Sequence, residues 1–106
     1  MPGPSFEIVY DEAVYKHLAS IELKHYSLIQ GTIGKQLSHE PEVETRNRKP
    51  LNRPSALGTV WELRFGPDNR FRVFYRLEAS ANQVRVLAIG VKTGSRLNIG
   101  GEEFEL

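Results

Sequence analysis

The hydrophobic residues of this chain follow a helical period near the N-terminus and a strand-like period over the second half. A short run of strand-forming residues, 6–10, comes first and is followed by Asp11, a residue that can cap a helix. Val14, Leu18 and Ile21 then recur at helical spacing. This pattern predicts a strand followed directly by a helix.

A second apolar stripe predicts another helix. Its members lie at positions i, i+3, i+7 and i+11: Tyr26, Ile29, Ile33 and Leu37. Pro41 ends this stretch, because the residue before a proline is pushed out of the helical region. The two stretches fit either a helical hairpin with a bend near residues 20–23 or one bent helix.

The second half of the chain predicts three strands after a polar segment. Residues 40–56 contain Pro41, Pro50 and Pro54 and read as a loop or an extended connection. Turn residues at 66–69 and 80–82 separate three strand-like runs: 59–65, 70–77 and 84–91. The last run is almost wholly apolar, as expected of a central strand that is buried on both faces.

Alternation sets the two faces of the predicted sheet. Trp61, Leu63 and Phe65 share one face, and so do the inward residues of the next strand: Phe71, Val73, Tyr75 and Leu77. The other face then presents outward-pointing residues: Glu62, Arg64, Arg70, Arg72, Phe74 and Arg76. The element order β-α-α-β-β-β predicts a small α+β domain, an antiparallel sheet with two N-terminal helices packed on one face. Residues 100–106 read as either a loose tail or a short edge strand.

Composition places the chain among ordinary globular domains. Its 106 residues fit a single domain spanning 1–106, with 40% hydrophobic and 25% charged residues. The absence of Cys excludes disulfides and thiolate chemistry. No apolar run approaches the roughly 20 residues that span a bilayer, and the first residues do not resemble a signal peptide. We therefore expect a cytoplasmic protein that has no membrane partner.

The charge is distributed unevenly along the chain. The net charge is +1, but residues 46–96 hold eleven basic and three acidic residues and carry +8. Residues 1–45 carry −4 and residues 97–106 carry −3. A basic middle built on strand-like sequence favours a surface that meets phosphates, against the simpler interpretation of a solvated face.

The order of these motifs resembles that of the RelE/ParE toxin superfamily of bacterial toxin–antitoxin systems. The resemblance covers most of the chain, from Phe6 to Arg96. It is carried first by Tyr10-Asp11-Glu12-Ala13, Leu37-Ser38-His39-Glu40-Pro41 and Lys49-Pro50-Leu51. It is strongest in the three strand motifs: Val60-Trp61-Glu62-Leu63-Arg64-Phe65, Phe71-Arg72-Val73-Phe74-Tyr75-Arg76 and the run from Val84 to Lys92.

The resemblance implies a toxin that an antitoxin holds inactive. RelE-like members are mRNA endonucleases that use no metal or other cofactor, and most cut on the ribosome, so mRNA, the ribosome and an antitoxin are the implied partners. The 2′-hydroxyl of the RNA attacks the adjacent phosphate, which requires cations, a base and an acid. By this resemblance, Arg64 falls where RelE has a lysine, and Arg72 falls on the arginine with which RelE contacts the phosphate. Lys92 falls where RelE has the arginine that is its proposed acid.

The chain also departs from the family pattern. RelE has a second lysine where this chain has Glu62, and a C-terminal tyrosine, a candidate base, near the position of Asn98. Some relatives use a histidine instead, but the three histidines of this chain all lie in the helical half: His17, His25 and His39. Glu62 is a candidate base, although a carboxylate flanked by arginines is a weak one. The alternative is a cross-strand ion pair from Glu62 to Arg72 or Arg76.

Further basic and aromatic residues are candidates for RNA binding. The polar segment contributes Arg46, Arg48, Lys49 and Arg53, which could grip the RNA backbone or form a mobile basic loop. The strands contribute Phe74, Arg76 and Arg96. Phe74 could stack on a base, an interaction worth about 1–3 kcal/mol, or pack against a partner or the C-terminal segment. The other strand aromatics are interpreted as core residues.

Two other functions remain open on the sequence alone. A ParE-like toxin inhibits DNA gyrase by binding and would cause DNA damage responses without RNA cleavage. A non-catalytic relative would keep the basic face only to bind a partner protein. The cationic sheet face favours the nuclease, whereas the missing C-terminal base favours the non-catalytic relative.

Overall fold

The computed structural model describes residues 5–51 and 59–105. The N-terminal part forms strand β1 (Glu7–Tyr10), helix α1 (Ala13–Ala19), a 3-10 turn (Leu23–His25) and helix α2 (Tyr26–Leu37). The helical hairpin is therefore correct, and the single bent helix is wrong. The N-cap of α1 is Glu12 rather than the expected Asp11, but the Asp11 carboxylate accepts a hydrogen bond from the backbone N–H of Ala13 at 3.0 Å and so satisfies one donor at the start of the helix.

The rest of the described chain contains six strands. They are β2 (Arg48–Pro50), β3 (Trp61–Phe65), β4 (Phe71–Glu78), β5 (Gln83–Thr93), β6 (Arg96–Ile99) and β7 (Glu102–Glu105). Their order in the sheet is β2-β3-β4-β5-β6-β7, each antiparallel to its neighbour, and β1 pairs with β5 in parallel. The α+β class is confirmed, and β1 makes the sheet mixed rather than purely antiparallel.

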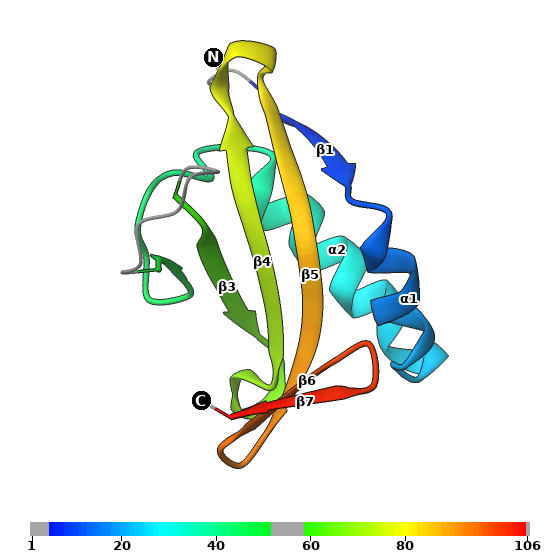
Figure 1. Cartoon of the computed structure of the whole chain (residues 1–106). Coiled ribbons are helices and arrows are strands. Elements are labelled where there is room, and N and C mark those ends of the chain that lie inside the picture. The colour runs from blue at the N-terminus through cyan, green and yellow to red at the C-terminus, as the bar shows by residue number, and fades with distance from the viewer. Residues whose placement is uncertain (1–4, 52–58, 106) are drawn as a thin grey trace.

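Strand β5 is central, as its apolar sequence predicts. One edge pairs with β4 along nearly the whole strand. The other edge pairs with β1 from Gln83 to Val86 and with β6 from Gly90 to Thr93. Figure 1 shows β5 running the length of the molecule, with β6 and β7 crossing its C-terminal end.

Two strands were not predicted from the sequence. Strand β2 lies within the segment expected to be a loop or an extended connection, and β6 lies beyond the last predicted strand and forms a hairpin with β7. The tail is thus an edge strand rather than loose. Gly100 and Gly101 make the turn between β6 and β7 with positive φ of 62° and 85°, which glycine adopts at little cost.

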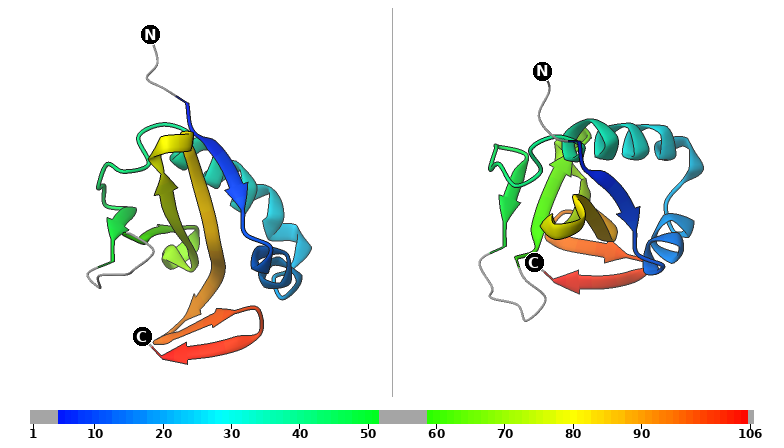
Figure 2. Two further views of the ribbon diagram at one scale, coloured as in Figure 1. Left: turned by 45° about the horizontal axis from the view of Figure 1, so that its top comes forward. Right: turned by 90° about the horizontal axis from the view of Figure 1, so that it is seen from above.

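The core lies between the helices and one face of the sheet. Both helices cover the same side of the central strands, and the hairpin β6–β7 lies on the other side from α2 (Figure 2). Five of the predicted inward residues are buried, Leu63, Phe65, Phe71, Val73 and Tyr75, and the other two, Trp61 and Leu77, are partly buried. They pack with buried residues of the helices, among them Val14, Ile29, Ile33 and Leu37. The side of the sheet away from α2, here called the outer face, is left for polar side chains.

No helix in the described residues is long and apolar enough to cross a membrane.

Candidate nucleic-acid interface

A carboxylate joins two arginines on the outer face of β3 and β4. Arg64 and Arg72 are direct cross-strand partners, and Glu62 lies two residues before Arg64 on the same strand face. Glu62 Oε1 lies 2.5 Å from Arg64 Nε and 3.4 Å from Arg72 Nη1. These three residues are called the Glu62 cluster below.

The members of the Glu62 cluster differ sharply in exposure. Glu62 and Arg72 are buried, at 6% and 5% relative exposure, whereas the Arg64 side chain is 41% exposed. Arg72 Nε also donates to the backbone carbonyl of Asn69 at 2.9 Å. Arg72 therefore lies on the predicted face but is not an exposed cation. Burial lowers the pKa of its guanidinium from the ordinary value, and the Glu62 carboxylate acts in the opposite direction.

The geometry leaves Arg64 as the outermost cation of the Glu62 cluster. Its Nε faces Glu62, and within the described residues neither of its terminal nitrogens has a hydrogen-bond partner. A guanidinium fixed through Nε can present its two outer N–H groups to an oxyanion in a planar fork. The cluster carries a net charge of +1 when all three groups are ionised, which suits one phosphodiester.

Of the two pairings foreseen for Glu62, the structure contains the pair with Arg72 and not the pair with Arg76. Arg76 Nη2 lies 3.3 Å from Glu78, which also pairs with Arg85 at 3.2 Å. Hydrogen bonds from Arg85 and then Arg76 lower the pKa of Glu78. Arg76 thus belongs to a separate ion-pair set near the other end of β4.

The polar segment is more structured than expected. Arg48 is buried, at 8% exposure, and its Nη1 donates to the carbonyl oxygen of Gln36 at 2.5 Å. That bond fastens β2 to the end of α2, so the prediction that Arg48 grips RNA from a basic loop does not fit its position. Arg46 and Lys49 are exposed. Arg53 and Pro54 lie outside the described residues.

Lys92 and Arg96 flank the turn that joins β5 to β6. Lys92 lies inside β5 rather than after it, and its backbone N–H donates to the Arg70 carbonyl at 2.6 Å. Its side chain lines a polar hollow of about 410 Å³ together with Arg70 and Asp68. Arg96 is exposed and pairs with Glu103 at 2.6 Å.

Phe74 is half-buried on the outer face, opposite Glu62 in the register. Its place beside the Glu62 cluster is compatible with the predicted stacking on a base.

A second polar cleft was missed by sequence reasoning. It lies between the α1–α2 turn and the ends of β4, β5 and β6, and has a volume of about 270 Å³. Its lining residues are Ser20, Ile21, Glu22, His25, Arg70, Phe71, Val91, Asn98 and Gly101. We call it the His25 cleft. No sequence signal indicated that His25 lines a cleft, because nothing in its local sequence places it beside Phe71, 46 residues further along the chain.

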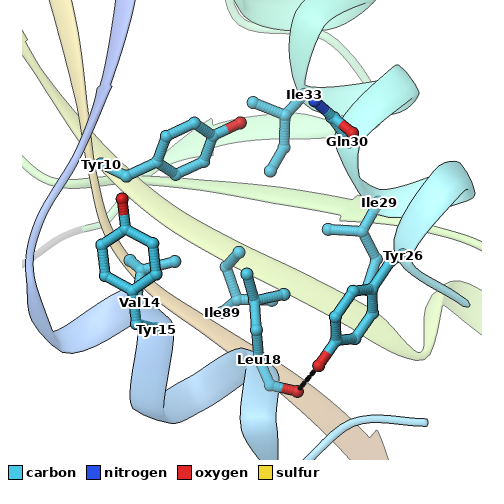
Figure 3. A pocket seen from close by; sticks show the side chains of 9 residues that line it. All are labelled: Tyr10, Val14, Tyr15, Leu18, Tyr26, Ile29, Gln30, Ile33 and Ile89. Carbon is cyan, nitrogen blue, oxygen red and sulfur yellow. Dashed lines mark hydrogen bonds between the residues drawn. The ribbon is translucent and has the colours of Figure 1, made fainter. Parts of the chain in front are cut away.

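An apolar groove opens between the two helices above β5. It holds about 280 Å³ and is lined by Tyr10, Val14, Tyr15, Leu18, Tyr26, Ile29, Gln30, Ile33 and Ile89. Figure 3 shows the three tyrosine rings around aliphatic side chains from both helices and β5, with Tyr26 donating to the Leu18 carbonyl. Burial and the neighbouring Tyr15 raise the pKa of Tyr10. We call this feature the tyrosine groove.

The described residues contain no group of three or more His, Asp or Glu side chains arranged to hold a metal ion.

Comparison with solved structures identifies the fold. A chain of the toxin–antitoxin complex RelBE2 from Mycobacterium tuberculosis superposes with a TM-score of 0.70, over 87% of this chain and 97% of that chain. The chain has the RelE-like fold. The two sequences are only 20% identical, so the likeness establishes the fold alone. No protein-family model matches the sequence, and no curated protein is significantly similar to it.

The expected site residues Glu62, Arg64 and Arg72 lie together on the outer face. Asn98 instead pairs with Val91, which pairs with the core residue Phe71, so all three point to the helix side. Asn98 is therefore not on the face of the two arginines.

Proposed function

We propose that this protein is the toxin of a type II toxin–antitoxin system and that it cleaves mRNA in the cytoplasm without a metal, acting on ribosome-bound message. The observation that carries the proposal is the Glu62 cluster on the outer face of a RelE-like fold. Two arginines converge there from adjacent strands, which is the type of site that stabilises a phosphoryl transition state.

The proposed reaction is an internal transfer at the RNA phosphate. The 2′-hydroxyl loses its proton to a base, its oxygen bonds to the adjacent phosphorus, and the bond from phosphorus to the 5′-oxygen breaks. The 5′-oxygen leaves with a proton from an acid, giving a cyclic phosphate and a free 5′-hydroxyl. Arg64 would contact the phosphate directly, and Arg72 would supply charge from behind it.

Lys92 is the proposed proton donor to the leaving oxygen. It lies two residues beyond Gly90, which is the register partner of Arg72, so the backbone positions of the two residues are offset by about 7 Å along the strand direction. The same alternation places Lys92 on the face of Arg72. That spacing suits two groups that act on opposite sides of one phosphodiester.

Glu62 has two possible roles in this scheme. Its short contacts with both guanidiniums support a positioning residue that holds the arginines at fixed spacing. As the carboxylate of the cluster it is also the candidate base for the 2′-hydroxyl. Its burial and double pairing favour the positioning role, because both features hinder proton uptake by a carboxylate that must approach the RNA.

A cognate antitoxin is the proposed protein partner. The tyrosine groove offers an apolar surface at which Tyr15 is 70% exposed and the groove floor is aliphatic. An amphipathic antitoxin helix could insert apolar side chains there. Acidic residues of the same partner would be attracted to Arg64 and Lys92, which would speed association at low salt.

One observation favours a second candidate function, a RelE-fold binding protein that does not cleave RNA. Glu62 already occupies donors of Arg64 and Arg72, where RelE carries a lysine, and Arg72 is buried. The carboxylate of Glu62 offsets one of the two positive charges, so the Glu62 cluster binds anions more weakly than three cations would.

Expression without antitoxin in bacteria tests the proposal. Wild type is compared with Arg64→Ala and with Arg72→Lys, since truncating the buried Arg72 could unfold the protein; Lys35→Ala, an exposed charge change on α2, is the matched control. The proposal predicts growth arrest and specific cleavage sites by primer extension for wild type and Lys35→Ala only. Arrest without RNA cleavage would indicate a protein target such as DNA gyrase. A folded wild type that causes no arrest would support the binding protein.

A further inference from the structure

We propose that the His25 cleft is a nucleobase-binding subsite, in which this protein holds one base of the RNA next to the cleaved phosphate. The inference rests on the proposed function and adds to it the origin of sequence preference. It concerns residues on the helix side of the sheet, away from the Glu62 cluster.

The floor of the His25 cleft is apolar and fixed by the core. Phe71 is 1% exposed, Ile21 is 8% exposed, and Val91 is the cross-strand partner of Phe71. Strands β4 and β5 hold two of these residues in register, and the segment that follows α1 supplies the third. A rigid apolar floor can accept the face of a planar ring without moving.

Two planar groups, the imidazole of His25 and the guanidinium of Arg70, lie against the ring of Phe71. The His25 ring centroid lies 5.2 Å from that of Phe71, tilted by 58°, and the Arg70 guanidinium carbon lies 5.6 Å from the ring centroid. Asn98 lines the same cleft from β6. The cleft therefore collects an imidazole, a guanidinium and an amide from three distant parts of the chain.

Within the described residues, none of these three polar side chains has a hydrogen-bond or ion-pair partner. The arginines of β3 to β6 differ in this respect: Arg64, Arg72, Arg76, Arg85 and Arg96 all pair with a carboxylate. Polar groups that converge over an apolar floor and leave their donors and acceptors unused are typical of a ligand site. Solvation alone gives no reason for the side chains of His25, Arg70 and Asn98 to gather in one cleft.

The chemistry of the lining favours a base over a bare phosphate. The flat imidazole of His25 and guanidinium of Arg70 suit stacking with a nucleobase, and the Asn98 amide can donate to and accept from a base edge. Glu22 also lines the cleft and would repel a buried phosphate, whereas its carboxylate can accept from an exocyclic amino group. The volume of about 270 Å³ is near the small end of ligand pockets and suits a single nucleoside.

Arg70 links the cleft to the proposed reaction site. It also lines the polar hollow that contains Lys92, and it lies two residues before Arg72. An RNA strand that passes over the β3–β4 turn could place a phosphate against Arg64 and Lys92 and the neighbouring base in the His25 cleft. The identity of that base would then influence which site is cut.

Titration of the isotope-labelled protein with nucleotides tests the inference independently of cleavage. The probes are the four nucleoside monophosphates and inorganic phosphate, and backbone amide shifts locate the binding site. We expect nucleotides to shift the amides of Ile21, His25, Val91 and Asn98, with one base preferred. Arg70→Ala and His25→Gln should weaken binding about tenfold, whereas Lys35→Ala should not. The amide spectrum of each variant shows whether it is folded.

Three results would overturn the inference: shifts confined to the Glu62 cluster, equal shifts with inorganic phosphate, or unchanged nucleotide affinity in both folded variants. Cleavage is measured separately on an RNA library. Nucleotide binding in the cleft by a protein that cuts no RNA would uphold the subsite and refute the nuclease. Cleavage with the same sequence preference in wild type and Arg70→Ala would uphold the nuclease and refute the subsite.

Discussion

His17 on α1 accepts a hydrogen bond from the backbone N–H of Ile89, with 3.3 Å between Nδ1 and the amide nitrogen. Ile89 lies in the gap on β5 between the last residue paired with β1, Val86, and the first paired with β6, Gly90. The imidazole thus satisfies a main-chain donor where strand pairing is interrupted. Only a ring whose Nδ1 is unprotonated can accept this bond.

This contact predicts acid-sensitive stability. Burial, with a smaller contribution from Lys16, lowers the pKa of His17 below 6.5. Because the unfolded chain binds the proton more readily, the contribution of His17 is fully present above about pH 6.5 and is lost as pH falls through the lower folded-state pKa. We expect the urea concentration at half unfolding of the wild type to decrease when the pH is lowered from 7.5 to 5. The loss of the hydrogen bond should cost about 1 kcal/mol in unfolding free energy.

The matched variants separate His17 from other groups. His17→Asn offers an amide oxygen to the Ile89 N–H and should remove most of the pH dependence, whereas His39→Ala, at an exposed position, should retain it. An unchanged pH dependence in His17→Asn would show that another group is responsible.

The sequence was most informative where burial enforces a period. Alternation in 59–65 and 70–77 placed Leu63, Phe71 and Val73 in the core and the Glu62 cluster on the opposite face. Strands β2 and β6 were missed because three or four residues of mixed polarity do not establish a period, and their pairing is set by distant partners.

The burial of basic side chains was the larger failure of prediction. Arg72 and Arg48 look like surface cations in the sequence, but both are buried, Arg72 paired with a carboxylate and a main-chain carbonyl and Arg48 with the main-chain carbonyl of Gln36. The His25 cleft depends on three segments that only the fold brings together, so no local pattern could reveal it.

The Glu62–Arg72 pair predicts a large difference between two substitutions of Glu62. Glu62→Ala leaves the buried Arg72 guanidinium without its carboxylate and should cost about 3–5 kcal/mol in unfolding free energy. Glu62→Gln keeps an acceptor oxygen at the same place and should cost clearly less. Chemical denaturation at pH 7 measures both, and equal losses in the two variants would contradict the importance of the pair.

Glu62→Gln also distinguishes a positioning residue from a base. If Glu62 only holds Arg64 and Arg72 in place, the variant should cleave RNA within about tenfold of wild type and with the same dependence of rate on pH. If the carboxylate takes the 2′-hydroxyl proton, cleavage should fall by about 10²-fold or more and the rise of rate with pH should disappear. Single-turnover rates on one RNA substrate from pH 5 to pH 9 decide between these outcomes, and we expect the first.

Two glycines predict opposite effects of the same substitution. A Cβ on Gly90 would lie 2.9 Å from the backbone oxygen of Asn98 and 2.9 Å from Cγ1 of Ile99, so Gly90→Ala must push β6 away from β5. We expect a loss of about 1–3 kcal/mol, the usual cost of overpacking, together with faster amide hydrogen exchange in β6. A Cβ on Gly31 of α2 meets no atom within 4 Å, so Gly31→Ala should stabilise the fold by about 0.5–1 kcal/mol.

Denaturation and hydrogen exchange of the two glycine variants test how tightly the hairpin β6–β7 is held. Exchange in Gly90→Ala should rise in β6 and β7 while the amides of β3 and β4 stay protected, because only the β5–β6 pairing is displaced. Uniform loss of protection would mean that β6 folds and unfolds together with the central strands. Because Asn98 lies on β6, loosening this hairpin should also weaken nucleotide binding in the His25 cleft, whereas Gly31→Ala should leave it unchanged.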